Sequence, residues 1–253
     1  MIGSGIAQSI GEVSLAHCGI LILDEAPEFK TKVLQALREP LDTQQVHISR
    51  VGSKTVYPAN CLCIFTCNLC PCGNRGKPTN MSATQSNEVT AWHGNTICMC
   101  SEHDVFRYWK RIGGALWDRI DIKYQTNYKD ASVIHKEEPL LERIQDIAQR
   151  REAISRALAR QSNRFPTPNS NTAVAKRNGR CNADDIAGSF EFTKEASAHV
   201  MHSTKANISD RARISLCRVS RTIADLEDDD MVCITHVDEA LRLTFGEHMH
   251  GIH

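Results

Sequence analysis

The sequence predicts an α/β fold in its first part and an all-helical fold in the remainder. A short apolar run from Ile20 to Leu23 ends in Asp24 and Glu25, which suits a parallel strand that is buried on both faces. A second expected strand, Ala59 to Thr66, is followed by another polar residue, Asn68. From about residue 130 onwards, helical periodicity and helix caps dominate instead. Because ligands bind outside the carboxyl ends of strands in open α/β sheets, both polar ends are candidate site residues.

The composition is that of an ordinary globular protein. Its 253 residues, 41% apolar and 24% charged, suffice for one large domain or two modest ones. Lys plus Arg and Asp plus Glu each total 30, so the net charge neither requires nor excludes a nucleic-acid partner. No apolar run of about 18 residues predicts a membrane span, and Met1 to Ile10 lacks the pattern of a signal peptide. The eleven cysteines then favour thiols or a metal site over disulfides, and we expect a cytoplasmic protein.

A helix is expected after the first strand. The segment from Lys30 to Glu39 places Val33, Leu34 and Leu37 on one face, a spacing typical of an amphipathic helix. Pro40 is expected to end this helix, because proline lacks the backbone N–H that a continuing helix needs.

A β-hairpin is expected next. Val46 to Arg50 and Thr55 to Tyr57 are strand-like segments on either side of Gly52-Ser53. Arg50 and Lys54 would then lie near the tip of the hairpin, where solvent exposure is the ordinary expectation for basic side chains.

The second strand alternates between two faces. Cys61 and Cys63 share one face, and Leu62 and Ile64 share the other. Since free cysteine is among the most buried residue types, these two cysteines are expected in the core. The polar stretch from Gly73 to Thr96 is expected to be a long loop or insertion.

The remainder of the chain is expected to be helical. The many arginines of a helix from about Glu137 to Gln161 favour a solvated face, with a basic interaction surface as the alternative. The apolar spine of this helix would be Leu141, Ile144, Ala148, Ile154 and Leu158. A linker is expected from Pro166 to Arg180, followed by a helical stretch from Ala183 to Ser203. Ser209 is expected to be the N-cap of a helix that runs through Ala224. A final helix is expected to be capped by Thr235, with Asp238 in the capping-box position.

Two C-x-C pairs form a candidate metal site. Cys70-Pro-Cys72 and Cys98-Met-Cys100 are separated by 25 residues. Four thiolates that converge tetrahedrally would bind a structural Zn²⁺ at Zn–S distances of about 2.3 Å. Such a metal would tie the polar loop at its base, beside Asn68. The alternative is four free thiols next to a loop, and His93 and His103 are spare ligand candidates.

Short motifs along nearly the whole chain resemble one protein family. They follow the family's order, and none of them would suffice alone. They are Gly11 to His17, Gly19 to Phe29, Leu37 to Leu41, Ile48 to Arg50, Pro58-Ala59, Asn68 to Gly73, Leu116 to Asp121, Arg218 to Leu226 and His236 to Leu241. Together they resemble the magnesium-chelatase-like AAA+ ATPases, most closely their ComM (YifB) competence branch.

The resemblance implies an ATP site that uses Mg²⁺. Asp24 would hold the Mg²⁺ and Glu25 would activate the attacking water, as in the Walker B motif. Asn68 would be the sensor that orients this water, since a neutral amide can accept from water and donate to phosphate at once. Judged from these residues alone, Asp24 and Glu25 could equally be a polar turn after a strand.

Two arginines have implied roles at the same site. Arg119 resembles the arginine finger that reaches a neighbouring subunit's nucleotide, and an ion pair with Asp118 or Asp121 is the alternative. Arg211 matches the second sensor on the helical lid, with Arg213 as a competitor. The resemblance therefore implies a homo-oligomeric ring of the hexamer type.

The resemblance also implies work on DNA. The hairpin with Arg50 and Lys54 resembles one that points into the central pore of related motors, where it would contact backbone phosphates. The implied function is helicase or branch-migration activity in natural transformation and recombination, without a membrane partner. The alternatives are a chelatase-subunit-like motor that acts on a protein partner, and a non-enzymatic zinc-bound fragment.

The sequence departs from the family pattern in two ways. It contains no G-x-x-x-x-G-K-[ST] phosphate loop (Walker A), and the nearest string, Gly73 to Pro78, has the wrong spacing. In the family this loop lies upstream of Walker B, so the chain resembles the later portion of such a protein and is not expected to hydrolyse ATP alone. Scattered differences, at Ala26, Leu69 and Gly114-Ala115, suggest a diverged copy.

The fold implied by the resemblance is an incomplete AAA+ P-loop-type core, with a parallel sheet and flanking helices, followed by an α-helical lid domain. The expected boundaries are 1–130 for the later part of the nucleotide-binding core and 131–180 for a connecting helix and linker. Residues 181–253 would form the helical lid, which resembles the C-terminal part of magnesium chelatase.

Overall fold

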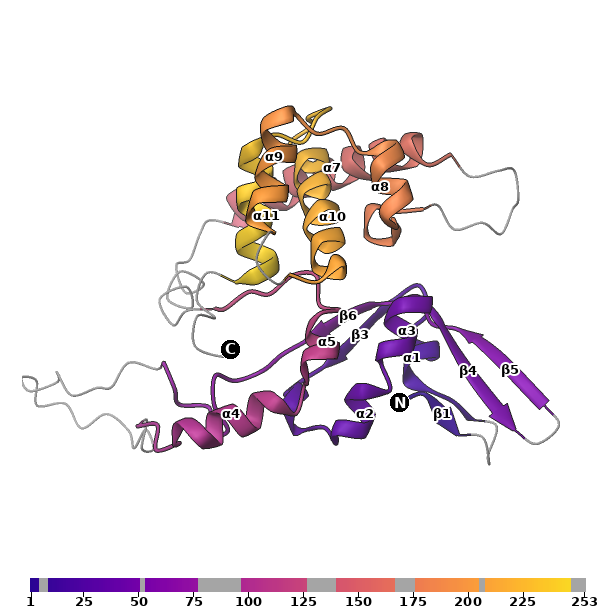
Figure 1. The fold of residues 1–253 in the computed structure, drawn as a ribbon, viewed down its shortest axis with the longest axis vertical. Coiled ribbons are helices and arrows are strands. Elements are labelled where there is room, and N and C mark those ends of the chain that lie inside the picture. Colours follow the sequence, from indigo (N-terminus) through magenta and orange to yellow (C-terminus); the bar gives the residue numbers. More distant parts are fainter. Residues whose placement is uncertain are drawn as a thin grey trace, which may run out of the picture. The chain divides into compact units, whose positions relative to one another are not determined.

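The computed structural model describes residues 1–4, 9–50, 53–76, 97–126, 140–166, 176–204 and 208–246. The chain divides into two compact units, Met1–Arg119 and Ile120–Gly251. Within the described ranges, all named strands lie in the first unit and the second is built of helices (Figure 1). No helix in these ranges has both the length and the apolar character that a bilayer crossing needs. The predicted mixed α/β fold is confirmed.

In the first unit, short helices lie around small sheets. Its strands are β1 (Gly3–Ser4), β2 (Ser9–Ile10), β3 (Ile20–Leu23), β4 (Gln45–Arg50), β5 (Ser53–Pro58) and β6 (Leu62–Phe65). Its helices are α1 (Glu12–Leu15), the 3-10 turn η1 (Ala26–Glu28), α2 (Thr31–Gln35), α3 (Arg38–Thr43), α4 (Glu102–Lys110) and α5 (Gly114–Trp117).

Strands β3 and β6 form a parallel pair, in register along all four residues of each. The expectation that β3 is buried on both faces is wrong. Ile20 and Ile22 are 59% and 62% exposed, and Leu62 and Ile64 beside them are 60% and 40% exposed. The described residues supply only two strands here and leave this apolar face uncovered, whereas parallel sheets normally carry helices on both faces.

The opposite face of the β3–β6 pair builds the core of the first unit. Leu23 is fully buried there, with Leu21, Phe65 and Cys61 packed against the same cluster. The expectation that Cys61 and Cys63 lie in the core is therefore only partly right, since both are half-buried and only Cys61 packs against this cluster. The other buried residues of the cluster are Val13, Ala26, Leu34, Leu37, Val46, Ala59, Ile112 and Leu116, which bring α1, α2, β4 and α5 onto the pair.

The segment after η1 forms two short helices instead of one. The break falls between α2 and α3 at Ala36 and Leu37, and Pro40 lies inside α3. The expectation that Pro40 ends a helix is thus wrong. Pro40 occupies the first turn of α3, where backbone N–H groups have no intrahelical acceptor and the missing donor costs little. The buried side chains of Leu34 and Leu37 hold both helices on the core.

The predicted hairpin is confirmed. Strands β4 and β5 pair antiparallel from Gln45↔Pro58 to Arg50↔Ser53, and they extend as a ribbon from the unit (Figure 1). Val46 near the base of the ribbon is buried in the core. The base is therefore anchored, while Arg50 lies at the tip end of the ladder.

The second unit is a helical assembly. Its elements are α7 (Leu140–Arg164), the 3-10 turn η2 (Asn178–Arg180), α8 (Ala183–Ser189), α9 (Lys194–Ser203), α10 (Asp210–Leu226) and α11 (Ile234–Phe245). Ser209 caps α10 as predicted, since its hydroxyl accepts the Ala212 backbone N–H at 3.2 Å. The buried core comprises Ala196, Val200, Leu216, Val219, Ile223, Ala224, Val232, Val237 and Ala240, from α9, α10 and α11 with the segment between them.

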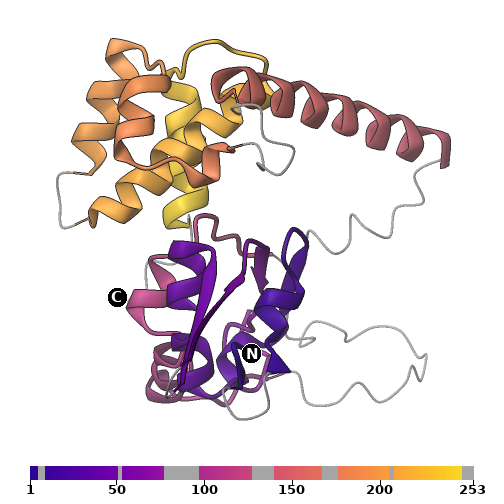
Figure 2. The same cartoon turned by 90° about the vertical axis from the view of Figure 1, so that its right-hand side faces the viewer.

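The long helix α7 packs on the other helices through its C-terminal half only. Figure 2 shows its N-terminal half extending beyond them. The predicted apolar spine is therefore wrong for the residues whose side chains are described, because Ile144, Ala148, Ile154 and Leu158 are all exposed. The buried side chains of α7 are Ala157 and Gln161 instead. Leu141, another predicted spine residue, has a side chain outside the described structure.

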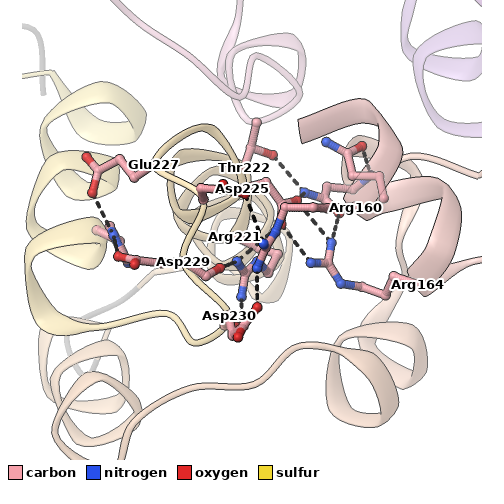
Figure 3. Close-up of polar contacts among 12 residues, drawn as sticks. Arg160, Arg164, Arg221, Thr222, Asp225, Glu227, Asp229 and Asp230 are labelled. Atoms are coloured by element: carbon pink, nitrogen blue, oxygen red, sulfur yellow. Dashed lines mark hydrogen bonds and ion pairs between the residues drawn. The ribbon is translucent and has the colours of Figure 1, made fainter. Parts of the chain in front are cut away.

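Three arginines converge on one fully buried carboxylate, Asp225 in α10 (Figure 3). Arg164 of α7 forms a bidentate pair with it, at 2.7 and 3.0 Å. Arg221 lies 3.1 Å from the same carboxylate and also donates to the Asp230 backbone carbonyl at 2.6 Å. Arg160 contributes a more distant pair at 3.8 Å. This network ties α7 to α10 and to the α10–α11 turn.

The segment expected to be a linker contributes to the same network. Asn178 in η2 is buried, and its side-chain amide donates to Asp225 at 2.7 Å. Its backbone N–H donates to Gln161 at 3.2 Å. Residues 176–180 are thus packed into the second unit, while residues 167–175 lie outside the described ranges.

The final helix begins two residues earlier than predicted, and with a different cap. Its N-cap is Cys233, whose backbone N–H donates to Nδ1 of His236 at 3.0 Å. The expected cap at Thr235 with Asp238 is therefore wrong. Val232 bonds to the Glu191 and Thr193 backbone in an extended conformation, so the helix starts directly after this anchored residue.

Candidate functional site

Two carboxylates stand at the end of β3, as predicted. Asp24 and Glu25 are both exposed, and Glu25 adopts a left-handed backbone conformation, with φ 51° and ψ 49°. The hydroxyl of Thr66, directly after β6, donates a short hydrogen bond to Oδ1 of Asp24. The same hydroxyl accepts the Glu25 backbone N–H at 2.9 Å. Thr66 therefore fixes the turn that presents both carboxylates to solvent.

Asn68 lies at the end of the neighbouring strand, as predicted. It is exposed and follows Thr66 by two residues, so β3 and β6 bring Asp24, Glu25 and Asn68 to the same edge of the sheet. The Asn68 backbone N–H donates to the Tyr108 hydroxyl of α4 at 3.3 Å. Trp109, next in α4, donates its indole N–H to the Leu69 carbonyl at 3.3 Å. Helix α4 thus supports the segment that carries Asn68.

Arg119 is engaged within its own unit. Its guanidinium pairs with Asp42 of α3, with Nε 3.1 Å from both carboxylate oxygens and Nη2 2.6 Å from Oδ2. The Arg38 carbonyl accepts from Nε at 3.2 Å, and the Ala115 carbonyl accepts a short bond from Nη1. The carboxylate partner is therefore Asp42, and not the neighbours considered from the sequence.

Arg211 and Arg213 both belong to the first turn of α10, in the second unit. Arg213 is half-buried and donates to Thr204 and Asp210, each at 3.3 Å. Arg211 is exposed.

The two basic hairpin residues lie at the tip end of β4 and β5. Arg50 is paired through the backbone with Ser53, and Ser49 with Lys54. The Lys54 side chain is exposed, while the Arg50 side chain is outside the described structure. The position near the tip is as predicted.

The two C-x-C pairs meet in space. The sulfur atoms of Cys70, Cys72, Cys98 and Cys100 all lie within 4.8 Å of one another. Cys70 and Cys72 are 3.3 Å apart, Cys70 and Cys98 3.6 Å, and Cys72 and Cys98 3.7 Å. A tetrahedral zinc–thiolate site with Zn–S bonds of about 2.3 Å would place its sulfurs about 3.8 Å apart. The donor set and its spacing therefore fit one Zn²⁺.

The thiols differ in their acidity. Burial raises the pKa of Cys70, but hydrogen bonds from the Arg75 backbone N–H and the thiols of Cys72 and Cys98 outweigh it and lower the pKa to about 6. At Cys100 the Cys72 backbone N–H lowers the pKa, but hydrogen bonding to the other thiols and burial together raise it to about 12. The lowered pKa of Cys70 favours its thiolate, which is the form that binds metal.

A second group of ligand-type side chains, which sequence reasoning missed, lies in the second unit. Asp229, Cys233 and His236 have ligand atoms within 4.8 Å of one another. Nδ1 of the buried His236 accepts the Cys233 N–H, so Nε2 carries the proton of the neutral ring. Nε2 donates to Glu227 at 2.9 Å and lies 3.2 Å from Asp229. Hydrogen bonding and helix capping account for this group, and its histidine offers no lone pair to a metal.

The supporting residues were missed by the sequence reasoning. Thr66 lies 42 positions from Asp24, Tyr108 lies 40 positions from Asn68, and Asp42 lies 77 positions from Arg119. Of these three supporting residues, only Thr66 could have been recognised from the sequence, because it ends the strand that was expected to lie beside β3. The other two depend on the packing of α3 and α4.

The chain matches two family models. The model "Magnesium chelatase, subunit ChlI" matches residues 1–134, and "Magnesium chelatase, subunit ChlI C-terminal" matches residues 145–244. These two matches cover both the unit with the acidic edge and the helical unit.

Curated relatives agree with this assignment. The uncharacterized protein YifB of Escherichia coli K12 is 29% identical over 95% of this chain and 42% of its own length. The competence protein ComM of Haemophilus influenzae is 30% identical over the same shares. An uncharacterized protein of Mycobacterium tuberculosis H37Rv is 32% identical over 49% of this chain and 21% of its own length. The chain spans less than half the length of these relatives, and it belongs to the magnesium chelatase subunit ChlI family, as a ComM-type member.

Proposed function

We propose that this chain carries the water-activating side of an AAA+ ATP site and takes part in ATP-driven remodelling of DNA. The observation that carries the proposal is the shared edge of β3 and β6. Two exposed carboxylates, Asp24 and Glu25, and one exposed amide, Asn68, come from the carboxyl ends of adjacent parallel strands. This is where open α/β sheets bind ligands.

Each residue has a chemical task in this proposal. Asp24 would hold Mg²⁺, which offsets charge on the nucleotide phosphates when bound. Glu25 would accept a proton from the attacking water, and Asn68 would orient that water. Thr66 supports the assignment, because its hydroxyl fixes one carboxylate oxygen of Asp24, and among the described residues no hydrogen bond occupies the second, which could bind a cation.

Arg119 and Arg211 extend the proposal to neighbouring parts of an assembly. Arg119 would act as an arginine finger toward the nucleotide of an adjacent subunit in a ring, and Arg211 as the second sensor. The Arg119 guanidinium is oriented by Asp42 and two backbone carbonyls. To reach a phosphate of an adjacent subunit, the guanidinium would have to exchange the Asp42 carboxylate for that phosphate.

The β4–β5 ribbon supports DNA as the partner. Lys54 is exposed near the tip, and Arg50 lies beside it in the ladder. A projecting basic tip can contact phosphates without reading sequence. The name of one relative, a competence protein, is consistent with a role in the handling of incoming DNA.

The four cysteines are proposed to hold a structural Zn²⁺. Its role would be mechanical, since a closed set of four thiolates leaves no open position for substrate. The ends of the segment between Cys72 and Cys98 would be tied together next to Asn68.

The experiment must supply a phosphate loop, because the sequence contains no phosphate-loop motif. The part of the Escherichia coli YifB relative that this chain does not match is joined ahead of the full chain. ATP turnover of this chimera is then measured with and without single-stranded and branched DNA.

The proposal predicts ATP turnover that rises with DNA. Replacement of both hairpin residues, Arg50→Ala with Lys54→Ala, should weaken DNA binding and make its salt dependence shallower by about one to two charges. Lys32→Ala, which removes an exposed lysine of α2, is the matched control and should change neither the affinity for DNA nor its salt dependence.

ATP turnover that does not change when DNA is added would favour the chelatase-like motor acting on a protein partner. A folded, zinc-bound chimera without any turnover would leave a non-enzymatic interaction domain.

A further inference from the structure

We infer that the four-cysteine centre is a positioning element for Asn68, so that metal loading determines how firmly the backbone that carries this side chain is held. The inference rests on the proposed zinc centre, and its importance for activity rests on the proposed role of Asn68. The observation behind it is that the turn with the first cysteine pair, Cys70 to Gly73, begins two residues after Asn68. The second cysteine pair leads directly into α4, whose Tyr108 accepts the Asn68 backbone N–H.

The turn from Cys70 to Gly73 lies against the Asn68 side chain. The Gly73 backbone N–H donates to the Cys70 carbonyl at 3.0 Å. A Cβ built on Gly73 would lie 3.7 Å from Cγ and Nδ2 of Asn68, which is ordinary van der Waals contact. Gly73 also adopts φ +71°, a left-handed conformation that favours glycine. Gly73, which directly follows the first pair of cysteines, therefore lies close to the Asn68 side chain.

The second pair of cysteines is coupled, through α4, to the backbone of Asn68. Cys100 is followed immediately by Ser101, the N-cap of α4, whose hydroxyl accepts the Asp104 N–H at 3.2 Å. Two turns further along α4, the Tyr108 hydroxyl accepts the Asn68 N–H. A metal bound by all four thiolates would join the end of β6 to the start of α4. Asn68 would then be held between the two.

The remaining contacts are too weak to hold Asn68 alone. The hydrogen bonds from Asn68 to Tyr108 and from Trp109 to Leu69 are both 3.3 Å, beyond the usual range for strong bonds. Within the part of the chain that the structure describes, the Asn68 side chain makes no hydrogen bond. Thiol–thiol contacts at 3.3 to 3.7 Å add little. Metal–thiolate bonds are far stronger than any of these interactions, so the metal decides how firmly the turn is held.

The test uses the full chain and does not depend on ATP. The ¹⁵N-labelled chain is freed of metal with a chelator and titrated with Zn²⁺, while bound zinc and amide hydrogen exchange are both measured. The expected result is one Zn²⁺ per chain. Hydrogen exchange of the Asn68 backbone N–H should be slower by about tenfold or more in the zinc-loaded chain than in the metal-free chain. The emission of Trp109 should shift in parallel, in a background of Trp92→Phe and Trp117→Phe.

Three variants make the test specific. Cys98→Ser should lose both zinc and the protection of Asn68. Cys18→Ser, which removes an exposed thiol outside the cluster, should keep both. Tyr108→Phe should keep zinc but lose most of the protection, because it removes the acceptor for the Asn68 N–H.

Two results would overturn the inference. One is stoichiometric zinc binding with unchanged exchange at Asn68, and the other is no zinc binding at micromolar metal. Full protection in the zinc-loaded Tyr108→Phe chain would exclude the route through α4. A different result would show that the inference holds but the proposed function of Asn68 does not. In that case zinc would slow hydrogen exchange at the Asn68 backbone N–H as expected, but Asn68→Ala in the chimera would leave ATP turnover unchanged.

Discussion

Asp42 and Arg119, 77 positions apart in the sequence, form a bidentate ion pair inside the first unit. The Arg119 side chain is only 13% exposed and that of Asp42 29%. The pair is therefore better shielded from water than a typical surface ion pair. It links α3 to the turn after α5 and fixes the direction of the guanidinium.

We expect Asp42→Asn to lower the free energy of unfolding of the first unit by about 1.5–3 kcal/mol, the usual contribution of a hydrogen-bonded charged group. All three tryptophans, at positions 92, 109 and 117, precede Arg119, so urea unfolding followed by tryptophan emission reports on this unit. Glu28→Gln is the control. It breaks the exposed pair with Arg111 and should cost less than about 1 kcal/mol. Equal effects of the two substitutions would contradict this account.

The buried charge network makes a second prediction. Asp225→Asn should destabilise the second unit by about 3–5 kcal/mol, because it leaves the buried Arg221 and the partly buried Arg164 without their carboxylate. Unfolding followed by helical circular dichroism should shift to lower urea, while the tryptophan transition stays in place. Asp228→Asn removes an exposed partner of Arg160 and should cost less than about 1 kcal/mol. If Asp225→Asn were as mild, the network would not hold α7 in place.

Thr66 provides a third prediction, on activity. Thr66→Val keeps the shape of the side chain but removes the hydroxyl that bonds to Asp24 and to the Glu25 N–H. In the chimera we expect the ATP turnover rate to fall by roughly 10- to 100-fold, as expected when an aligned catalytic group loses its support. Thr66→Ser should restore most of it, and Thr55→Val on β5 should have no effect. An unchanged rate in Thr66→Val would show that the turn is held by other means.

The cysteine centre makes a fourth prediction, on metal content. The purified chain should contain one Zn²⁺, and Cys72→Ser or Cys100→Ser should lower its affinity for zinc by orders of magnitude, because a thiolate ligand is lost. Cys181→Ser, which removes a buried thiol of the second unit, should keep the metal. Acid should release the metal, since protons compete for the thiolates. Metal analysis of the dialysed proteins distinguishes these outcomes, and equal zinc in all variants would place the metal elsewhere.

The sequence allowed prediction of the features that depend on local pattern. The apolar run before Asp24 and the alternation around Cys63 predicted two strands, and the turn residues predicted the hairpin. The paired cysteines predicted a cluster that the fold does assemble. These signals are local because side-chain alternation and turn chemistry act over a few residues.

Features that depend on tertiary contacts were not predictable. Pro40 was expected to end a helix, but the anchoring of Leu34 and Leu37 moved the break to the residues before it. The cap of α11 shifted to Cys233, because Val232 is fixed by pairing with a distant segment. The exposed face of Ile20 and Ile22 could not be recognised from an apolar run, since such a run does not report which faces are covered.

The most direct test of the central claim is the comparison of ATP binding and ATP hydrolysis in the Glu25→Gln chimera. The account predicts that this substitution leaves Mg²⁺–ATP binding nearly intact, because Asp24 is untouched. It should slow hydrolysis by about 10²- to 10⁴-fold, the usual contribution of a general base. Glu12→Gln, an exposed carboxylate in α1, serves as the control. Hydrolysis at the unaltered rate in Glu25→Gln would contradict the assignment of the β3–β6 edge as the site of ATP chemistry.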